Sequence, residues 1–353
     1  MHSLIVHFAA LALLSLGSVG VSRAACSTAS PRDCVREGMQ ILQADTPDAA
    51  GAIERFELAC KAGEMSGCTA LGVLAQRGHG LTQDTSRARA LFELACDGNE
   101  AQGCVNVGNL LLADIEAQDA ETRGLVYFMK ACELKLAGGC YNAALLYAMK
   151  GSPVENRKKA VRLFDRACQG GDPQGCFNAG VHYAEGNGTP RNLRRAKKYF
   201  SQACEGGDPG GCTNLGVLLE KSGKSASQLK AARELYERGC RQGDMLGCVN
   251  LGLMHEGGRG TSMNVALAEK LFEQACNHRL VEGCWRLGRI LVQTDNTVQL
   301  GERLLAQACE DGQPMSCYEI ARRRLTRDTD KESVRPQLLK ACTGGIKEAC
   351  KLL

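Results

Sequence analysis

The sequence predicts an all-α fold, a solenoid of stacked helical hairpins. The chain of 353 residues contains twenty cysteines, which form ten pairs whose members are eight residues apart. From Cys60 to Cys276 the first cysteine of a pair returns every 36 residues, and the last two intervals are 33. A fixed period in this range is typical of repeat arrays, whose units stack around a shared core. No run of alternating β-branched residues indicates a strand.

The cysteine pairs predict local disulfides. In one continuous helix, residues eight apart are separated by about 12 Å, whereas a disulfide needs Cα atoms within about 7 Å. The chain must therefore reverse inside each pair. The segments between the paired cysteines contain Gly, Asp, Asn and Pro, which are common in turns. The C-x2-C spacing of zinc sites does not occur, and we expect no metal and no cofactor. The expected disulfides are Cys26–Cys34, Cys60–Cys68, Cys96–Cys104, Cys132–Cys140, Cys168–Cys176, Cys204–Cys212, Cys240–Cys248, Cys276–Cys284, Cys309–Cys317 and Cys342–Cys350.

Each repeat is expected to contain two helices, A and then B. Helix A follows the second cysteine and has apolar residues at helical spacing. A glycine-rich turn comes next, as at 78–80, 186–188 and 257–260. Helix B then ends on the first cysteine of the next pair with an Ala-x-x-x-Phe/Tyr pattern, as at 88–96 and 160–168. Small residues alternate with large ones in this pattern, so adjacent helices are expected to interlock.

Residues 1–25 are predicted to be a signal peptide, because an apolar stretch is followed by Ser22-Arg23-Ala24-Ala25, which fits the small-residue rule for cleavage. Together with the paired cysteines, this predicts a secreted or periplasmic protein. Lipid anchoring at Cys26 is the alternative. Residues 26–353 are predicted to form one solenoid domain of about nine hairpins and a C-terminal stub, and no later segment is apolar enough to span a bilayer.

The charge balance argues against a nucleic-acid partner. The formal net charge is +4, from 43 Lys and Arg against 39 Asp and Glu. The two signs are interspersed, and basic runs such as 322–324 are short, as on solvated helix faces. We therefore expect a protein or peptide partner.

The repeat resembles a known family. The segments ACDGNEAQGCVNVG at 95–108 and ACEGGDPGGCTNLGVL at 203–218 are similar to Sel1-like repeats, and their cysteine-paired form resembles the Helicobacter cysteine-rich proteins. The resemblance implies an exported, right-handed superhelix of α/α hairpins related to tetratricopeptide arrays. It also implies two alternative functions. Some members are described as penicillin-binding proteins or β-lactamases, and a eukaryotic relative serves respiratory-complex assembly in the mitochondrial intermembrane space.

An enzymatic role finds little support in the residues. A serine β-lactamase needs S-x-x-K, S-x-N and K-[ST]-G on defined structure. This chain contains Ser227-Gln-Leu-Lys230, Ser262-Met-Asn264 and Lys221-Ser-Gly223, in the wrong order and without a sheet to hold the last motif. The sequence contains no recognisable Ser/His/Asp or Cys/His catalytic arrangement, because its cysteines are expected to form disulfides. We therefore predict no catalytic residues and favour a non-enzymatic role.

A row of amides is the best candidate for a binding site. Asparagine stands two positions after the second cysteine in five successive repeats, and the next repeat has arginine there. These side chains are expected to form a ladder on the A helices, which line the concave groove of related solenoids. An amide both donates to and accepts from an extended peptide backbone. The alternative is that each amide bonds the neighbouring helix or its turn. The candidate ligand-binding residues are Asn106, Asn142, Asn178, Asn214, Asn250, Arg286 and Trp285.

Part of this row resembles the carboxylate clamp of tetratricopeptide domains, namely Asn214, Asn250 and Arg286. The clamp's lysines four residues earlier are replaced here by Gly210, Leu246 and Glu282. Arg286 is predicted either to meet an acidic ligand group or to pair with Glu282 one helical turn earlier. Trp285, the only tryptophan, is predicted either to anchor a ligand or to pack between repeats.

Overall fold

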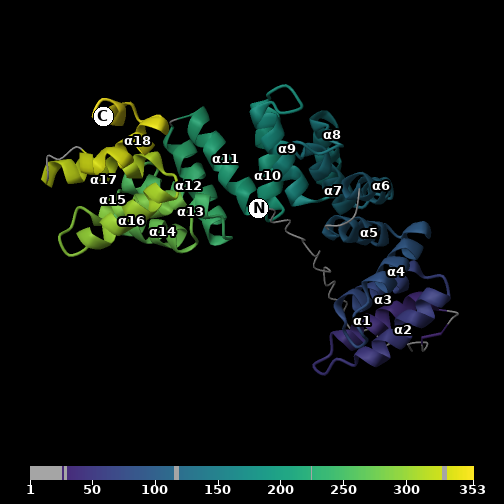
Figure 1. Ribbon diagram of the computed structural model, residues 1–353. Coiled ribbons are helices and arrows are strands. Elements are labelled where there is room, and N and C mark those ends of the chain that lie inside the picture. Colours follow the sequence, from purple (N-terminus) through teal and green to yellow (C-terminus); the bar gives the residue numbers. More distant parts are fainter. Residues whose placement is uncertain (1–25, 28–29, 115–118, 224, 328–331) are drawn as a thin grey trace. The chain divides into compact units, whose positions relative to one another are not determined.

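The computed structural model describes residues 26–27, 30–114, 119–223, 225–327 and 332–353, so the predicted signal peptide at 1–25 lies outside the described residues. Within that part the chain is helical and contains no strand, which confirms the predicted all-α class (Figure 1). The helices are α1 (Pro31–Leu42), α2 (Ala49–Lys61), α3 (Met65–Arg77), α4 (Thr85–Asp97), α5 (Ala101–Ala113), α6 (Ala120–Glu133), α7 (Ala137–Ala148), α8 (Arg157–Gln169), α9 (Pro173–Glu185), α10 (Leu193–Glu205), α11 (Pro209–Ser222), α12 (Ala226–Arg241), α13 (Met245–Glu256), α14 (Val265–Asn277), α15 (Val281–Leu291), α16 (Val298–Glu310), α17 (Pro314–Arg327), the 3-10 helix η1 (Glu332–Val334), α18 (Arg335–Thr343) and α19 (Lys347–Cys350).

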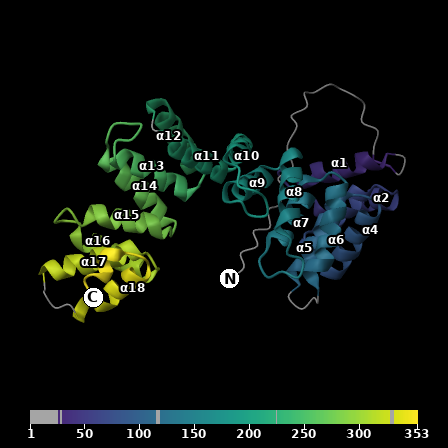
Figure 2. The ribbon, with the colours of Figure 1, turned by 90° about the horizontal axis from the view of Figure 1, so that it is seen from above.

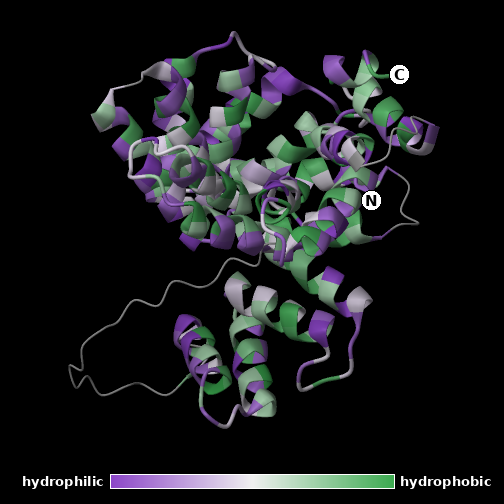
Figure 3. Cartoon of the chain, turned by 90° about the vertical axis from the view of Figure 1, so that its left-hand side faces the viewer, coloured by the Kyte–Doolittle hydropathy of each residue, from purple (hydrophilic) through white to green (hydrophobic). Residues whose placement is uncertain are grey.

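The helices pack in consecutive pairs, as the hairpin prediction requires. The odd-numbered helices are A helices and the even-numbered ones are B helices. Within each of α1–α3 and α5–α19, a helix packs mainly against its neighbours in sequence (Figure 2). The contacts fall into two compact units, 1–94 and 95–353, whose boundary lies within α4. Hydrophobic and hydrophilic residues are interspersed along the helices (Figure 3).

Polar residues in the turns start the helices. Asn156, Asn192 and Asn264 precede the B helices α8, α10 and α14, and each side-chain oxygen accepts a hydrogen bond from the backbone three residues later. Asp172 and Asp208 do the same for the A helices α9 and α11. Such caps satisfy backbone N–H groups that have no partner inside the helix, and each stabilises it by about 1 kcal/mol.

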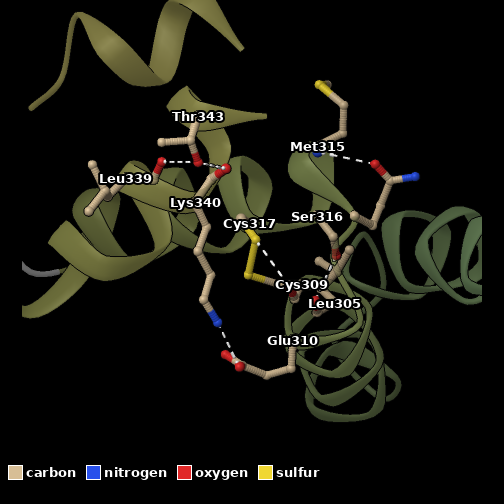
Figure 4. The surroundings of a disulfide bond; sticks show 10 residues. Leu305, Cys309, Glu310, Met315, Ser316, Cys317, Leu339, Lys340 and Thr343 are labelled. Atoms are coloured by element: carbon tan, nitrogen blue, oxygen red, sulfur yellow. Dashed lines mark hydrogen bonds and ion pairs between the residues drawn. A yellow bond between two sulfur atoms is a disulfide. The ribbon is translucent and has the colours of Figure 1, made fainter. Parts of the chain in front are cut away.

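All ten predicted disulfides form, and none of the twenty cysteines is free. The paired Cα atoms lie between 4.4 and 4.8 Å apart. Except for Cys26–Cys34, each bond joins the end of a B helix to the start of the next A helix, as Figure 4 shows for Cys309–Cys317. At that junction the Ser316 hydroxyl donates to the Leu305 carbonyl oxygen at 2.6 Å. Cys26, the first of the twenty, is bonded to Cys34.

Glycine lets the two helix ends at each junction approach closely. A Cβ on Gly175 would lie 2.6 Å from the Ala167 Cβ, and one on Gly211 would lie 2.6 Å from the Ala203 Cβ. The turn itself needs a left-handed residue, which is Gly207 (φ 94°) between α10 and α11. The repeated Gly–Cys dipeptide therefore fixes how close consecutive hairpins lie.

A second close contact lies inside six of the hairpins, where an aromatic ring of helix B packs on a glycine of helix A. These rings are at most 2% exposed. A Cβ on the facing glycine would lie 2.5–2.7 Å from the ring. The pairs are Gly38–Phe56, Gly72–Phe92, Gly108–Phe128, Gly180–Phe200, Gly216–Tyr236 and Gly252–Phe272.

Arginine side chains join successive B helices. Arg166 of α8 donates to the Cys132 carbonyl oxygen at the end of α6 at 3.0 Å, and Arg238 of α12 donates to that of Cys204 at the end of α10 at 2.7 Å. The last carbonyls of a helix have no partner inside it and carry partial negative charge, so a guanidinium is well placed there.

Candidate functional site

The predicted asparagine row lies on five successive A helices. Each side chain is partly buried, so each amide retains some access to solvent. The row consists of Asn106 of α5, Asn142 of α7, Asn178 of α9, Asn214 of α11 and Asn250 of α13.

Three of these amides bond within their own helices, two of them to a backbone carbonyl. The Asn178 Nδ2 donates to the Gln174 carbonyl oxygen at 3.0 Å, and the Asn214 Nδ2 donates to that of Gly210 at 2.9 Å. Burial raises the pKa of Tyr141 on the preceding A helix, and Asn178 lies near enough to its hydroxyl to lower that pKa less strongly. An amide has two donor hydrogens and an oxygen with two lone pairs, so one such bond leaves Asn214 with further donor and acceptor capacity.

The other amides differ in their surroundings. The Asn106 oxygen accepts from the Gln102 side chain at 3.1 Å. Asn250 lines a pocket, described below. The structure thus places the row at one register of the A helices, but it gives the members different local partners.

Arg286 and Trp285 make contacts inside the chain. The Arg286 Nε lies 2.8 Å from a Glu282 oxygen, and its guanidinium carbon lies 4.0 Å from the centre of the Trp285 ring. Trp285 is 7% exposed and packs in a cluster with Leu305 and Ile320. The pairing of Arg286 with Glu282 and the packing of the Trp285 ring, which were the alternatives to a ligand role, are both present in the structure. A ligand role for either residue stays a prediction.

A pocket of about 590 Å³ opens between α11, α12 and α13. This volume falls within the usual range of ligand pockets, about 300–1,000 Å³. It is lined by Val217, Glu220, Lys221, Leu229, Tyr236, Asn250, Leu253 and Arg259.

The polar groups of this pocket are interconnected. The buried Tyr236 donates its hydroxyl to a Glu220 carboxylate oxygen at 2.8 Å, and Arg259 forms an ion pair with the other oxygen. Burial raises the pKa of Tyr236, and the hydrogen bond to Glu220 and its negative charge raise it further. Tyr236 therefore stays protonated and acts as a donor, and Glu220 is held by two partners.

A row of carboxylates marks the N-terminal ends of three A helices. Asp172, Asp208 and Asp244 precede α9, α11 and α13, and they lie near enough to influence one another's charge. Burial raises the pKa of Asp208, as do Asp244 and Asp172, whereas backbone N–H groups of Gly211 and Gly210 oppose this. The 36-residue spacing of these aspartates was the signal for the row in the sequence, but each of them also suits a turn on its own.

The three β-lactamase-like motifs lie at helix ends. Asn264 accepts from the Leu267 N–H as the cap of α14, and the Ser227 hydroxyl lies 3.2 Å from that of Ser225 at the start of α12. Lys221 lies near the end of α11 and lines the pocket. No strand exists in the described part to hold a K-[ST]-G motif as those enzymes do.

In the part of the chain that the structure describes, no three His, Cys, Asp or Glu side chains gather in a way that suits a metal ion. No helix there combines the length and hydrophobicity needed to cross a bilayer. Ten disulfides indicate an oxidising, extracytoplasmic compartment.

Comparison with known families decides what kind of repeat this is. The model of the Sel1 repeat matches five segments, which together make up half of the chain: 66–100, 137–172, 173–208, 209–244 and 246–279. The chain belongs to the Sel1 repeat family. The resemblance stated from the cysteine-paired segments is thereby confirmed, and a Sel1 repeat scaffold is typically a protein-binding fold.

The chain is similar to the following solved structures, and those with a TM-score above 0.5 support its Sel1 fold. A protective antigen of uropathogenic Escherichia coli with an SLR fold is 20% identical and has a TM-score of 0.79, covering 91% of this chain and 70% of that one. A Sel1 repeat protein from Oxalobacter formigenes is 19% identical with a TM-score of 0.57, covering 69% and 96%. Helicobacter pylori cysteine rich protein B is 24% identical with a TM-score of 0.22, covering 46% and 92%. No curated protein sequence matches this Sel1 repeat chain significantly.

Proposed function

We propose that this Sel1 repeat protein is an exported scaffold that binds an extended segment of a protein or peptide along its A helices. The observation that carries the proposal is the row Asn178, Asn214 and Asn250, which are partly exposed amides at one register of three successive A helices. Amides spaced in this way hold a peptide backbone without reading its sequence, because they both donate and accept.

The spacing of the helices favours the A side as the inner, ligand-facing side. Within residues 95–353, successive A helices approach one another closely, as α5 does α7, α7 does α9, α9 does α11 and α11 does α13. Among the described B helices, only α8 and α10 approach to the same extent. In a stack of hairpins the more closely spaced row lies on the inside of the curve, and solenoids use that extended concave surface for binding.

The disulfides support export as part of this proposal. Twenty cysteines, all paired, suit a secreted or periplasmic protein and not a reducing cytosol. The apolar stretch within 1–25 fits a signal peptide, although it lies outside the described residues. Fractionation of the producing cell, with detection of the mature N-terminus by mass spectrometry, tests this part directly.

The binding proposal is tested with the variant Asn178→Ala/Asn214→Ala/Asn250→Ala. We expect this variant to keep the helical circular dichroism of the wild type. When it is used as bait in periplasmic or extracellular extract, less of any partner should be recovered with it. Its affinity for an identified partner should fall by about 1–2 kcal/mol, the cost of losing several hydrogen bonds. A matched control removes three exposed amides from B helices, Gln169→Ala, Gln202→Ala and Gln274→Ala.

The control and the melting curve separate the two alternatives for the row. Unchanged recovery by the asparagine variant, or an equal loss in the glutamine control, would overturn the binding role. A collapse of the melting temperature with the asparagine variant alone would show that the amides serve the helices themselves.

A further inference from the structure

We propose that the pocket between α11, α12 and α13 is the specificity subsite of this scaffold, and that it takes an apolar side chain of a peptide with an acidic residue beside it. The inference rests on the proposed function, because it assumes a peptide lying along the A helices. It adds the class of ligand, an apolar–acidic pair, which the asparagine row alone does not define.

The walls of the pocket suit an apolar side chain. Val217, Leu229 and Leu253 are partly exposed in it, although each belongs to a helix whose other residues build the core. The Tyr236 ring closes the pocket at its buried side, with 1% of the residue exposed. Covering apolar area in such a pocket favours binding.

The charges of the pocket favour an anion next to that apolar group. The lining contains two cations, Lys221 and Arg259, and one carboxylate, Glu220. Glu220 already binds Arg259 and the Tyr236 hydroxyl. Lys221 is exposed and forms no ion pair with any described residue, so one positive charge at the pocket is left without a partner.

The opposite ends of the A helices carry the opposite charge. Asp244 lies at the N-terminal end of α13, and Arg259 follows its C-terminal end; a helix of 12 residues separates these ends by about 18 Å. Asp208 stands at the equivalent end of α11, the helix that carries Lys221 near its other end. An acidic side chain is therefore repelled at one end of these helices and attracted at the pocket.

Asn250 connects the pocket with the asparagine row. It lines the pocket, and it follows Asn214 by one repeat at the same register. A peptide whose backbone bonds these amides brings its next side chains to Leu253 and Tyr236. This continuity favours a peptide over a free small molecule as the occupant.

The proposal is tested by calorimetric titration of the oxidised full chain with four hexapeptides blocked at both ends. The first is Gly-Ser-Phe-Asp-Ser-Gly, and the others replace its Phe by Ser, its Asp by Asn, or its Asp by Lys. We expect the first peptide to bind about tenfold more tightly than the Ser version and about fivefold more tightly than the Lys version, with the Asn version between. Equal affinities for the Asp and Lys versions, or for the Phe and Ser versions, would overturn the proposal.

Variants of the pocket locate the effect. Lys221→Gln and Arg259→Gln should each abolish the preference for Asp over Lys. Lys230→Gln, which removes an exposed cation that does not line the pocket, should retain it. An equal effect of Lys221→Gln and Lys230→Gln would show a general charge effect and would contradict the pocket.

The asparagine variant distinguishes failure of this proposal from failure of the proposed function. Loss of affinity for all four peptides in that variant, with no effect of the pocket variants, would leave the scaffold proposal standing and overturn the pocket. Loss only in the pocket variants would support the pocket and contradict the row. Absence of binding by all four peptides would contradict the pocket, and the partner recovery described above would then decide on the scaffold alone.

Discussion

Arg286 and Glu282 form an ion pair at 2.8 Å across one turn of α15. The second oxygen of Glu282 accepts from the Gln313 side chain, just before α17, at 2.7 Å. Glu282 therefore ties one repeat to the next, and Arg286 helps to hold it in place. The predicted ligand role of Arg286 must compete with this internal pair and with the contact to the Trp285 ring.

Arg286→Ala should lower the free energy of unfolding by about 1 kcal/mol, because it removes a pair at i,i+4 and a cation–π contact. A double-mutant cycle with Glu282→Gln should give a coupling of about 0.3–0.5 kcal/mol, measured by urea denaturation. Arg303→Ala, on an exposed arginine of α16, is the control and should change stability little. Equal losses for Arg286→Ala and Arg303→Ala would leave Arg286 as a solvated surface residue.

Removing one disulfide should cost about 2.6 kcal/mol by the chain-entropy model for so short a loop. We expect Cys204→Ala/Cys212→Ala to lower the melting temperature measured by circular dichroism. Full reduction of the wild type should lower it much further, because stability in a stacked array is roughly a sum over its units. Equal melting temperatures with and without reductant would mean that helix packing alone holds the repeats together.

Much of the fold could be predicted because its determinants are local in sequence. Asn192 caps α10, and Phe200 marks the buried side of that helix. The spacing of Cys204 and Cys212 then forces the chain to reverse at the end of α10. Each of these features recurs with the repeat, so one unit indicates the others. The asparagine row was found in the same way, from its register.

The pocket could not be predicted because it depends on residues that depart from the repeat. Tyr236 stands where Phe200 and Phe272 stand in the neighbouring repeats, and its extra hydroxyl meets Glu220. Arg259 comes from the turn after α13, which has its own sequence in each repeat. The signal for this site in the sequence was therefore the residues that break the 36-residue period, Tyr236 and Arg259, and not the period itself.

The glycines facing the aromatic rings should not tolerate a methyl group. In Gly252→Ala the new Cβ would lie 2.6 Å from the Phe272 ring, which is fully buried and cannot move aside. Overpacking of this kind typically costs about 1–3 kcal/mol. Gly138→Ala is the matched control, because a Cβ there meets nothing within 4 Å and Ala favours the helix by about 0.5–1 kcal/mol. Urea denaturation should therefore show a loss for the first variant and a gain for the second; a gain in both would contradict the ring contact.

Asp208→Asn should stabilise the protein at neutral pH and should not do so in acid. Burial, with Asp244 and Asp172, raises the pKa of Asp208 in the folded chain. At a pH below the pKa of the unfolded chain, about 3.9, the carboxyl is protonated in both states. Its charge then does not affect the free energy of unfolding. As the pH rises through the unfolded and then the folded pKa, the folded chain must hold a disfavoured charge, so its stability falls relative to the variant.

The control for this prediction is another aspartate cap. Asn caps a helix as well as Asp does, so the bond that Gly211 N–H donates at 2.7 Å should persist in the Asp208→Asn variant. Asp84, which accepts from the Arg87 N–H at 2.8 Å, is exposed, so Asp84→Asn should show no comparable gain. The two variants are compared by urea denaturation at pH 3, 5 and 7. A difference from wild type that is the same at all three values would assign the effect of Asp208→Asn to the cap geometry and not to its buried charge.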